Sequence, residues 1–264
     1  MKHITVLFAL TLTAGSLAGC TTEVRSGTPA EGRPIASSST STAALPPEEA
    51  LLAAVHATEA TAYSFTIKQG SKSGSGRIDP AAKSAAASLG GTVEQVTVSV
   101  AYTVIAPELW VKADFGKELN KLWGMPGNTW MLIDRTKASS TATLPVDEAG
   151  APQLGVTDLF KHGLAEVERT DATHFTGTVD MTAADSVLAP SADVVKQAGA
   201  KARAVPFTAV VDGRGHLTAF TVNGASIDPE LALALAFADF GAVPPVTRPA
   251  DAITAPAAVY KLFD

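Results

Sequence analysis

Two segments in which large apolar residues alternate strictly with small residues constrain the fold of this chain more than any other feature. In residues 95–105, every second position from Val96 to Val104 is a valine or a tyrosine. A repeat of two matches the spacing of side chains on one face of a β-strand. Thr, Ser and Ala occupy the positions between. We therefore expect a strand with one apolar face and one small, weakly polar face.

The second segment, residues 231–240, has the sequence LALALAFADF and allows two interpretations. Leu and Ala favour helices, and Asp228, Pro229 and Glu230 could cap a helix that starts here. In a helix, however, the leucines would spread around much of the circumference, whereas a strand directs them all to one side. We predict a strand and keep the helix as the alternative.

Turn signals indicate that the strands form an antiparallel sheet. The dipeptides Asp212-Gly213 and Asn223-Gly224 are typical of tight hairpins, because both turn positions need positive φ angles. Residues 71–76, rich in Gly and Ser, predict a further turn. Further strands are expected at residues 63–68, 77–79, 83–89, 108–114, 129–134, 174–181, 203–211 and 216–222, and helices at residues 46–60, 115–123, 156–167 and 191–199.

The predicted fold class is α+β, with a strongly curved antiparallel β-sheet (a half-barrel) and helices packed on its concave side. Hydrophobic residues make up 46% of the chain, ample for one domain, which we place at residues 48–264. Since neither face of the strands is strongly polar, we expect both faces to be covered. Such a layer either fills with side chains or leaves an apolar cavity between sheet and helices.

The amino-terminal residues predict export followed by a lipid anchor. Residues 1–19 have a basic start, a short apolar run and small residues, as in a secretory signal peptide. Leu17-Ala18-Gly19-Cys20 matches a bacterial lipobox, in which the cysteine receives acyl chains. Cys20 is the only cysteine, so no disulfide partner competes for its thiol. The alternative is an ordinary signal peptide that contains a cysteine by chance.

Residues 20–47 are rich in Ser, Thr, Pro, Gly and Ala without periodicity, which is typical of a disordered tether. An acylated Cys20 would hold the domain at the extracytoplasmic face of the cell membrane. The formal charge is −6, and removal of residues 1–19 deletes one cation, Lys2, and no acid, which gives −7. A negative chain without a cationic stripe argues against nucleic acid binding.

No motif predicts catalysis, a metal or a cofactor. The histidines His56, His162, His174 and His216 are isolated and lack metal-ligand spacing. Neither a nucleophile elbow nor a phosphate-binding loop is found in the sequence. We therefore expect a noncatalytic protein, and an envelope hydrolase remains the least favoured hypothesis.

The order of elements, with the lipobox and the tether, resembles the LppX and LprG type lipoproteins of actinobacterial envelopes, which belong to the LolA-like superfamily. The matching segments are residues 76–80 (GRIDP), 108–112 (ELWVK), 130–134 (WMLID), 205–212 (VPFTAVVD) and 237–241 (FADFG), followed by Pro249. They cover most of residues 45–264, whereas residues 80–91 and 145–155 depart from the pattern. The resemblance implies a half-barrel that holds acyl chains of lipids or lipoglycans for transport or presentation, with an envelope transporter as a candidate partner.

Such a cavity needs few polar bonds, because each acyl methylene removed from water contributes about 0.8 kcal/mol. We expect it to be lined by Phe65, Ile67, Val98, Val100, Leu109, Phe207, Phe220, Leu233, Leu235 and Phe237. Leu122, Trp123 and Met125 flank Gly124 and Pro126, and we interpret them as a cavity rim, with packing at the core edge as the alternative. The runner-up function is a noncatalytic interaction or sensor module of the envelope, with the same fold and a filled core.

Overall fold

The computed structural model describes residues 45–93, 96–137, 154–184 and 188–263, without the side chains of Val93 and residues 261–263. These residues belong to one compact unit, Ala44–Asp264. The predicted signal peptide, Cys20 and the tether as far as residue 44 lie outside the described residues, so they stay predictions.

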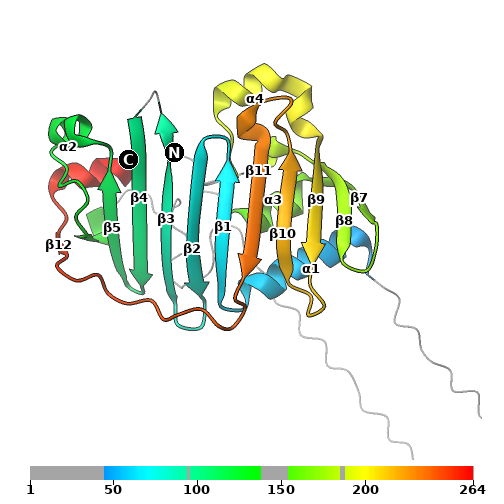
Figure 1. Cartoon of the computed structure of the whole chain (residues 1–264), viewed down its shortest axis with the longest axis horizontal. Coiled ribbons are helices and arrows are strands. Elements are labelled where there is room, and N and C mark those ends of the chain that lie inside the picture. Colours follow the sequence, from blue (N-terminus) through cyan, green and yellow to red (C-terminus); the bar gives the residue numbers. More distant parts are fainter. Residues whose placement is uncertain (1–44, 94–95, 138–153, 185–187, 264) are drawn as a thin grey trace, which may run out of the picture. The chain divides into compact units, whose positions relative to one another are not determined.

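The described residues form an α+β structure around one large sheet of twelve strands (Figure 1). The strands are β1 (Tyr63–Gln69), β2 (Lys72–Asp79), β3 (Ser84–Val93), β4 (Val96–Ile105), β5 (Glu108–Asp114), β6 (Met131–Ile133), β7 (Leu164–Arg169), β8 (His174–Val179), β9 (Val205–Val211), β10 (Leu217–Asn223), β11 (Ala232–Ala238) and β12 (Ile253–Thr254). Their order across the sheet is β12-β6-β5-β4-β3-β2-β1-β11-β10-β9-β8-β7. Neighbouring strands are antiparallel except β12 and β6, which are parallel.

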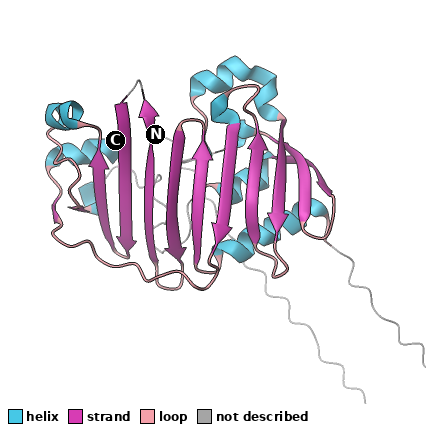
Figure 2. Cartoon of the chain, viewed as in Figure 1, coloured by secondary structure: helices cyan, strands magenta, loops and turns pink. Residues whose placement is uncertain are grey.

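Helices lie near both ends of this sheet (Figure 1). The α-helices of the described residues are α1 (Pro47–Glu59), α2 (Lys117–Trp123), α3 (Val156–Gly163) and α4 (Ala192–Ala198). The 3-10 helices are η1 (Arg135–Lys137), η2 (Met181–Ala183), η4 (Gly199–Arg203), η5 (Pro229–Leu231) and η6 (Ala257–Phe263). Figure 2 shows α1 and α3 behind the strands near β7, with α2 and α4 at the upper edge of the sheet. Helix α1 contacts α3, β7 and β10.

Among the described residues, one face of the sheet is buried over most of its length. We call it the inner face, and it carries Phe65, Ile67, Leu235 and Phe237, all buried. On the opposite, outer face, Ala234, Ala236 and Ala238 of β11 are exposed, as are Thr66 and Thr208. The expectation that both faces are covered is therefore wrong for these strands. The physical reason is that alanine and threonine present little apolar area, so water contact costs them little free energy.

Several predicted elements are confirmed. The helix at residues 46–60 is α1, the strand at residues 108–114 is β5, and the alternating segment at residues 95–105 is β4. Residues 231–240 contain a strand, β11, rather than a helix, with Leu233, Leu235 and Phe237 on the inner face. The period of two was decisive because one face of this strand is buried and the other is not.

The predicted turn at residues 71–76 is wrong. Only Gly70 and Ser71 form the turn, and Lys72 already begins β2. Glycine is needed inside this strand because a Cβ atom at Gly76 would lie 2.8 Å from the ring of Phe65. A Cβ atom at Gly74 would lie 2.5 Å from Cδ2 of Leu89. These glycines therefore mark close packing of neighbouring side chains and not a chain reversal.

Three other boundaries differ from the predictions. The helix predicted at residues 156–167 ends at Gly163, and Leu164 begins the strand β7, because pairing with β8 outweighs a helical pattern of apolar residues. Asn223-Gly224 is not a two-residue turn, since residues 224–231, including η5, connect β10 to β11. The strand predicted at residues 129–134 shortens to β6. Strand β12 and helix η6 were not predicted.

Candidate functional site

The end of the inner face near β7 is filled by aromatic rings. Phe160 of α3 lies 4.8 Å from Phe220 of β10, and Phe220 lies 5.2 Å from Phe207 of β9, as measured between ring centroids. All three are buried. A Cβ atom at Gly177 of β8 would lie 2.8 Å from Phe207, so this ring fills the space above the glycine. Two predicted cavity residues, Phe207 and Phe220, therefore pack as ordinary core.

The centre of the inner face is also closely packed. Phe65 pairs with Phe237 across β1 and β11, and Tyr63 packs edge-on against Phe237 with ring centroids 5.7 Å apart. Burial, with a smaller contribution from Glu59, raises the pKa of the Tyr63 hydroxyl. This group therefore stays neutral and fits an apolar layer.

Four further predicted residues lie on this face in contact with the core. Ile67 pairs with Leu235, and Gln69 pairs with Leu233, so Leu233 and Leu235 lie beside β1. Leu109 of β5 lies farther along the sheet, opposite Val104 of β4. All of these leucines and Ile67 are buried. The structure thus gathers Phe65, Ile67, Leu233, Leu235 and Phe237 at the centre of one core, which continues across the sheet to Leu109.

Among the described residues, the inner face is more open near the start of β4. Val96, Val98 and Val100 of β4 and Leu89 of β3 are only half-buried, although they belong to the same face as the buried core. We call these four residues the open row. Farther along the same strands and the same face, Val104 and Ala85 are fully buried. Val98 and Val100 were predicted site residues, and Val96 follows from the same alternation.

The predicted rim residues separate into two environments. Met125 is buried, whereas Leu122 is 75% exposed and Trp123 is 46% exposed at the end of α2. Trp123 packs edge-on against Phe115, with ring centroids 5.2 Å apart. Helix α2 begins beside the open row, since a Cβ atom at Gly116 would lie 3.7 Å from Cγ1 of Val96. Leu122 and Trp123 are therefore exposed apolar residues near this open part of the face.

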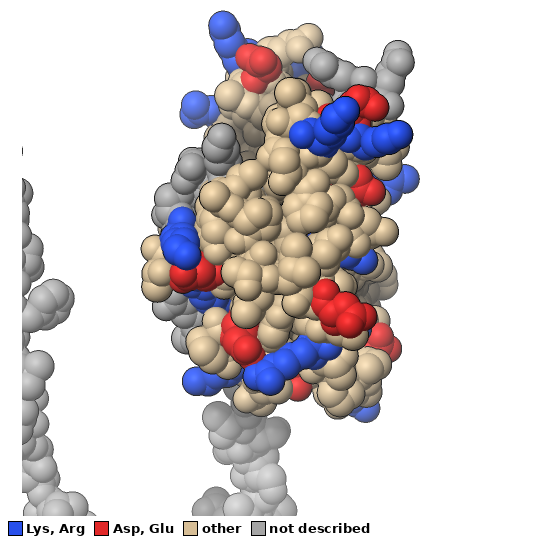
Figure 3. All heavy atoms as spheres, turned by 90° about the vertical axis from the view of Figure 1, so that its left-hand side faces the viewer, with Lys and Arg blue, Asp and Glu red and all other residues tan. Residues whose placement is uncertain are grey.

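Two hollows lined by described residues lie away from the open row. The first, of about 520 Å³, lies beside β5 and β6 and is lined by Pro107, Glu108, Leu132, Ile133, Asp134, Arg135 and Thr254. Figure 3 views this end of the sheet, where uncharged residues fill the middle and charged ones gather above and below. The second, of about 360 Å³, lies at one end of β1, β10 and β11.

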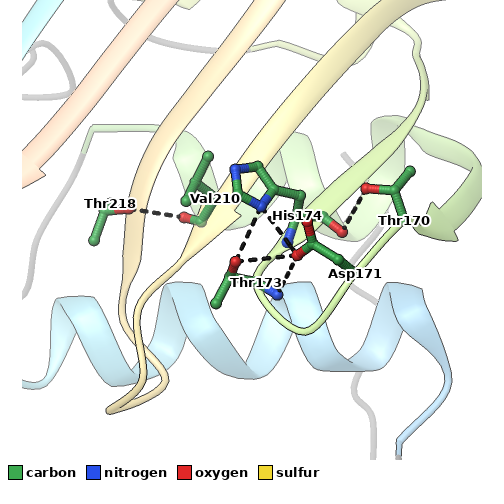
Figure 4. A network of polar contacts seen from close by, with 6 residues as sticks. All are labelled: Thr170, Asp171, Thr173, His174, Val210 and Thr218. Carbon is green, nitrogen blue, oxygen red and sulfur yellow. Dashed lines mark hydrogen bonds and ion pairs between the residues drawn. The ribbon is translucent and has the colours of Figure 1, made fainter.

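A threonine, a histidine and an aspartate meet in the turn between β7 and β8 (Figure 4). Thr173 Oγ1 donates to Asp171 Oδ1 at 3.1 Å, and both of these atoms lie 3.0 Å from the same ring nitrogen, Nδ1 of His174. A proton relay would need the two groups on different ring nitrogens. The arrangement therefore lacks the geometry of a catalytic triad.

The same carboxylate shapes the turn. Asp171 Oδ1 accepts the backbone N–H groups of Thr173 at 2.8 Å and His174 at 2.9 Å. The N–H of Thr173, followed by the ring of His174, holds the pKa of Asp171 well below its usual range. Asp171 and His174 are both exposed. We conclude that these residues close a hairpin.

The other predicted histidines show no shared site. His216 stacks on Phe240 with ring centroids 4.3 Å apart, and its Nδ1 lies 3.2 Å from Asp212 Oδ2 in the turn before β10. His56 and His162 lie on α1 and α3 and are exposed. No group of three or more His, Cys, Asp or Glu side chains placed to hold a metal ion was found among the described residues.

No helix in the described part of the chain is both long enough and apolar enough to cross a membrane. No protein-family profile matches the sequence. A comparison with curated proteins also found no match.

Proposed function

We propose that this chain is a membrane-anchored envelope lipoprotein that binds acyl chains of lipids or lipoglycans for transport or presentation. The proposal rests on the open row: Leu89, Val96, Val98 and Val100 are only partly buried, whereas Ala85 and Val104 on the same face of the same strands are fully buried. Exposed apolar surface next to a packed core is typical of a ligand-binding or partner-binding region.

The chemistry of these residues favours an acyl chain. Valine and leucine offer no hydrogen-bond donor or acceptor in their side chains, so an occupant gains mainly by leaving water. Each methylene that is removed from water contributes about 0.8 kcal/mol, and several methylenes in contact with the open row suffice for binding. The lipobox at Cys20 and the resemblance to LppX and LprG type lipoproteins support a ligand of this class and a half-barrel fold of the LolA-like type.

The packing restricts where the acyl chain would lie. Phe160, Phe207 and Phe220 fill the inner face between α3 and β9. The rings of Phe65 and Phe207 occupy the spaces above Gly76 and Gly177. We therefore place the ligand over β3 and β4 and not in the centre of the predicted cavity.

Lipid extraction tests the proposal. The full chain would carry Cys20→Ala, so that a covalently attached acyl group cannot be mistaken for a bound ligand. Mass spectrometry of the extract should reveal a lipid in stoichiometric amount, and a fluorescent fatty acid should compete with it. Finding neither a bound lipid nor fatty acid binding would contradict the proposal.

Matched variants on the two faces of β4 locate the site. Val98→Asp places a carboxylate in the open row and should weaken fatty acid binding by about tenfold or more. Ser99→Asp places the same group on the exposed outer face of the same strand and should leave binding unchanged. Circular dichroism checks that both variants fold. Equal weakening by both variants would argue against a site at the open row.

The closely packed core supports a second candidate, a noncatalytic interaction or sensor module of the envelope. In that case the open row would be covered by a partner protein. Crosslinking from position 98 in intact cells distinguishes the two, because a lipid-binding protein yields a lipid adduct and an interaction module yields a protein adduct.

A further inference from the structure

Helix α2 presents an exposed apolar surface beside the open row. Leu122 is 75% exposed and Trp123 is 46% exposed, and both lie in the last two positions of α2. Phe115 packs against Trp123 at 5.2 Å and fixes the indole at the surface. A leucine and a tryptophan exposed together are costly in water, which indicates that another phase or molecule contacts them.

The charges on α2 restrict what that contact is. Lys117 and Lys121 are exposed and four positions apart, so they lie on the same side of the helix, and Glu118 is the one exposed acid of α2. The neighbouring carboxylate, Asp114, accepts the N–H of Gly116 at 2.9 Å and the amide of Asn120 at 2.8 Å, so it faces the helix start. Lys112 of β5 lies 5.1 Å above the ring of Trp130. On α2 itself, the two exposed lysines therefore outnumber the single exposed acid.

We propose that the α2 tip, formed by Lys117, Lys121, Leu122 and Trp123, binds the surface of an anionic phospholipid bilayer. Tryptophan prefers the boundary between headgroups and acyl chains, leucine enters the acyl region, and lysine binds the lipid phosphates. This combination fits a lipid surface better than a purely apolar protein partner.

The contact would have a use in lipid transfer. Since Gly116 at the start of α2 lies beside Val96, binding through the tip would hold the open row close to the bilayer. This use rests on the proposed acyl-binding function, whereas the bilayer contact itself does not. The two proposals can therefore fail separately: extraction tests the acyl ligand, and the experiment below tests the tip.

Tryptophan fluorescence of the full chain tests the tip directly. Vesicles would be made of phosphatidylcholine alone or of an equal mixture with phosphatidylglycerol, with and without brominated acyl chains as quenchers. We expect the Trp123 emission to shift to the blue and to be quenched in the anionic vesicles. Trp123→Phe should remove this quenched component, whereas Trp130→Phe, which alters a half-buried tryptophan, should retain it.

Side-chain variants separate the apolar and the ionic contributions. Leu122→Ser should lower the partition coefficient of the tip, obtained by titrating lipid, by roughly tenfold. Leu132→Ser alters a leucine of β6 that is 37% exposed and should leave the coefficient unchanged. Lys117→Gln and Lys121→Gln should each lower it by roughly fivefold in anionic vesicles only.

Two results would overturn the proposal. One is a Trp123 emission that neither shifts nor loses intensity in either kind of vesicle. The other is a shift that depends on protein concentration in the absence of lipid, since a second copy of the chain would then cover the tip.

Discussion

The hydroxyl of Thr58 accepts the backbone N–H of Leu217 at 2.9 Å, across 159 positions of sequence. The same hydroxyl donates to the Leu217 carbonyl at 3.4 Å. Both residues are buried, so one side chain of α1 satisfies both backbone groups at the start of β10. This pair fixes the end of α1 against the inner face and helps to close the part of the sheet where the aromatic rings pack.

We predict that Thr58→Val lowers the free energy of unfolding by about 1–3 kcal/mol, because it leaves the Leu217 N–H buried without a partner. Denaturant unfolding measures the change. Thr58→Ser is the matched control, since it keeps the hydroxyl and loses only a methyl group. A valine variant at least as stable as the serine variant would show that this hydrogen bond does not hold α1 in place.

A glycine in β2 allows the second prediction. At Gly76 a Cβ atom would lie 2.6 Å from the Ala86 carbonyl oxygen and 2.8 Å from the Phe65 ring. Since a backbone atom cannot turn away, Gly76→Ala should destabilise the fold by about 1–3 kcal/mol. Gly213→Ala is the control, because nothing lies within 4 Å of a Cβ atom there. Thermal unfolding that shifts equally in both variants would refute the packing argument.

The alternation of large apolar and small residues predicted the strands in which one face is buried and the other is not. The alternating positions Val96 to Val104 and Leu233 to Phe237 follow this rule, since these side chains share the inner face in β4 and β11. Strand β2 does not follow it. Residues of the adjacent strands β1 and β3 leave no room for a side chain at positions 74 and 76, so both positions are glycine. Residues 164–167 belong to β7 through pairing with β8. In β2 and in β7, contacts with other strands therefore determine the structure, and a local sequence pattern carries no information about those contacts.

The same limit applies to the candidate site. The period of two assigned Val98, Val100, Phe207 and Phe220 to one face, and the pairing confirms that they share it. Which part of the face is closed depends on where α1 and α3 lie. Phe160 of α3 covers the part near β9 and leaves the start of β4 half-exposed. Sequence therefore predicted the face and not the position of its opening.

The carboxylate of Glu59 gives a prediction about pH. Burial raises the pKa of this group above its ordinary value of 4.5, although the Thr157 hydroxyl donates to it at 2.6 Å. Above the raised pKa of the folded state, Glu59 is ionised, and the full energetic penalty of its buried charge destabilises the fold. As pH falls through the native pKa towards 4.5, the folded state takes up a proton before the unfolded state does, and the penalty is relieved.

We therefore expect Glu59→Gln to be more stable than the parent at neutral pH, with a difference that shrinks as the solution is acidified. The measurement is the free energy of unfolding of both proteins between neutral pH and pH 4.5, the ordinary pKa of a glutamate carboxyl group. Glu49→Gln, in the first turn of the same helix, controls for the removal of a carboxylate from α1. A stability difference between Glu59→Gln and the parent that is constant with pH, or that grows on acidification, would contradict the raised pKa of Glu59.

Arg135 carries the last prediction. Its guanidinium nitrogens Nε, Nη1 and Nη2 are buried and have no hydrogen-bond partner in the part of the chain that the structure describes. The nearby carboxylates are engaged elsewhere, Asp134 with Lys137 at 3.1 Å and Glu108 with Arg248. Since a buried charge without a partner opposes folding, Arg135→Met should raise the free energy of unfolding by about 1–4 kcal/mol. Arg248→Met, which removes a surface ion pair, should change it by less than about 1 kcal/mol. Urea unfolding of the two variants decides the matter, because a loss of stability on replacing Arg135 would mean that its charge is compensated in the folded protein.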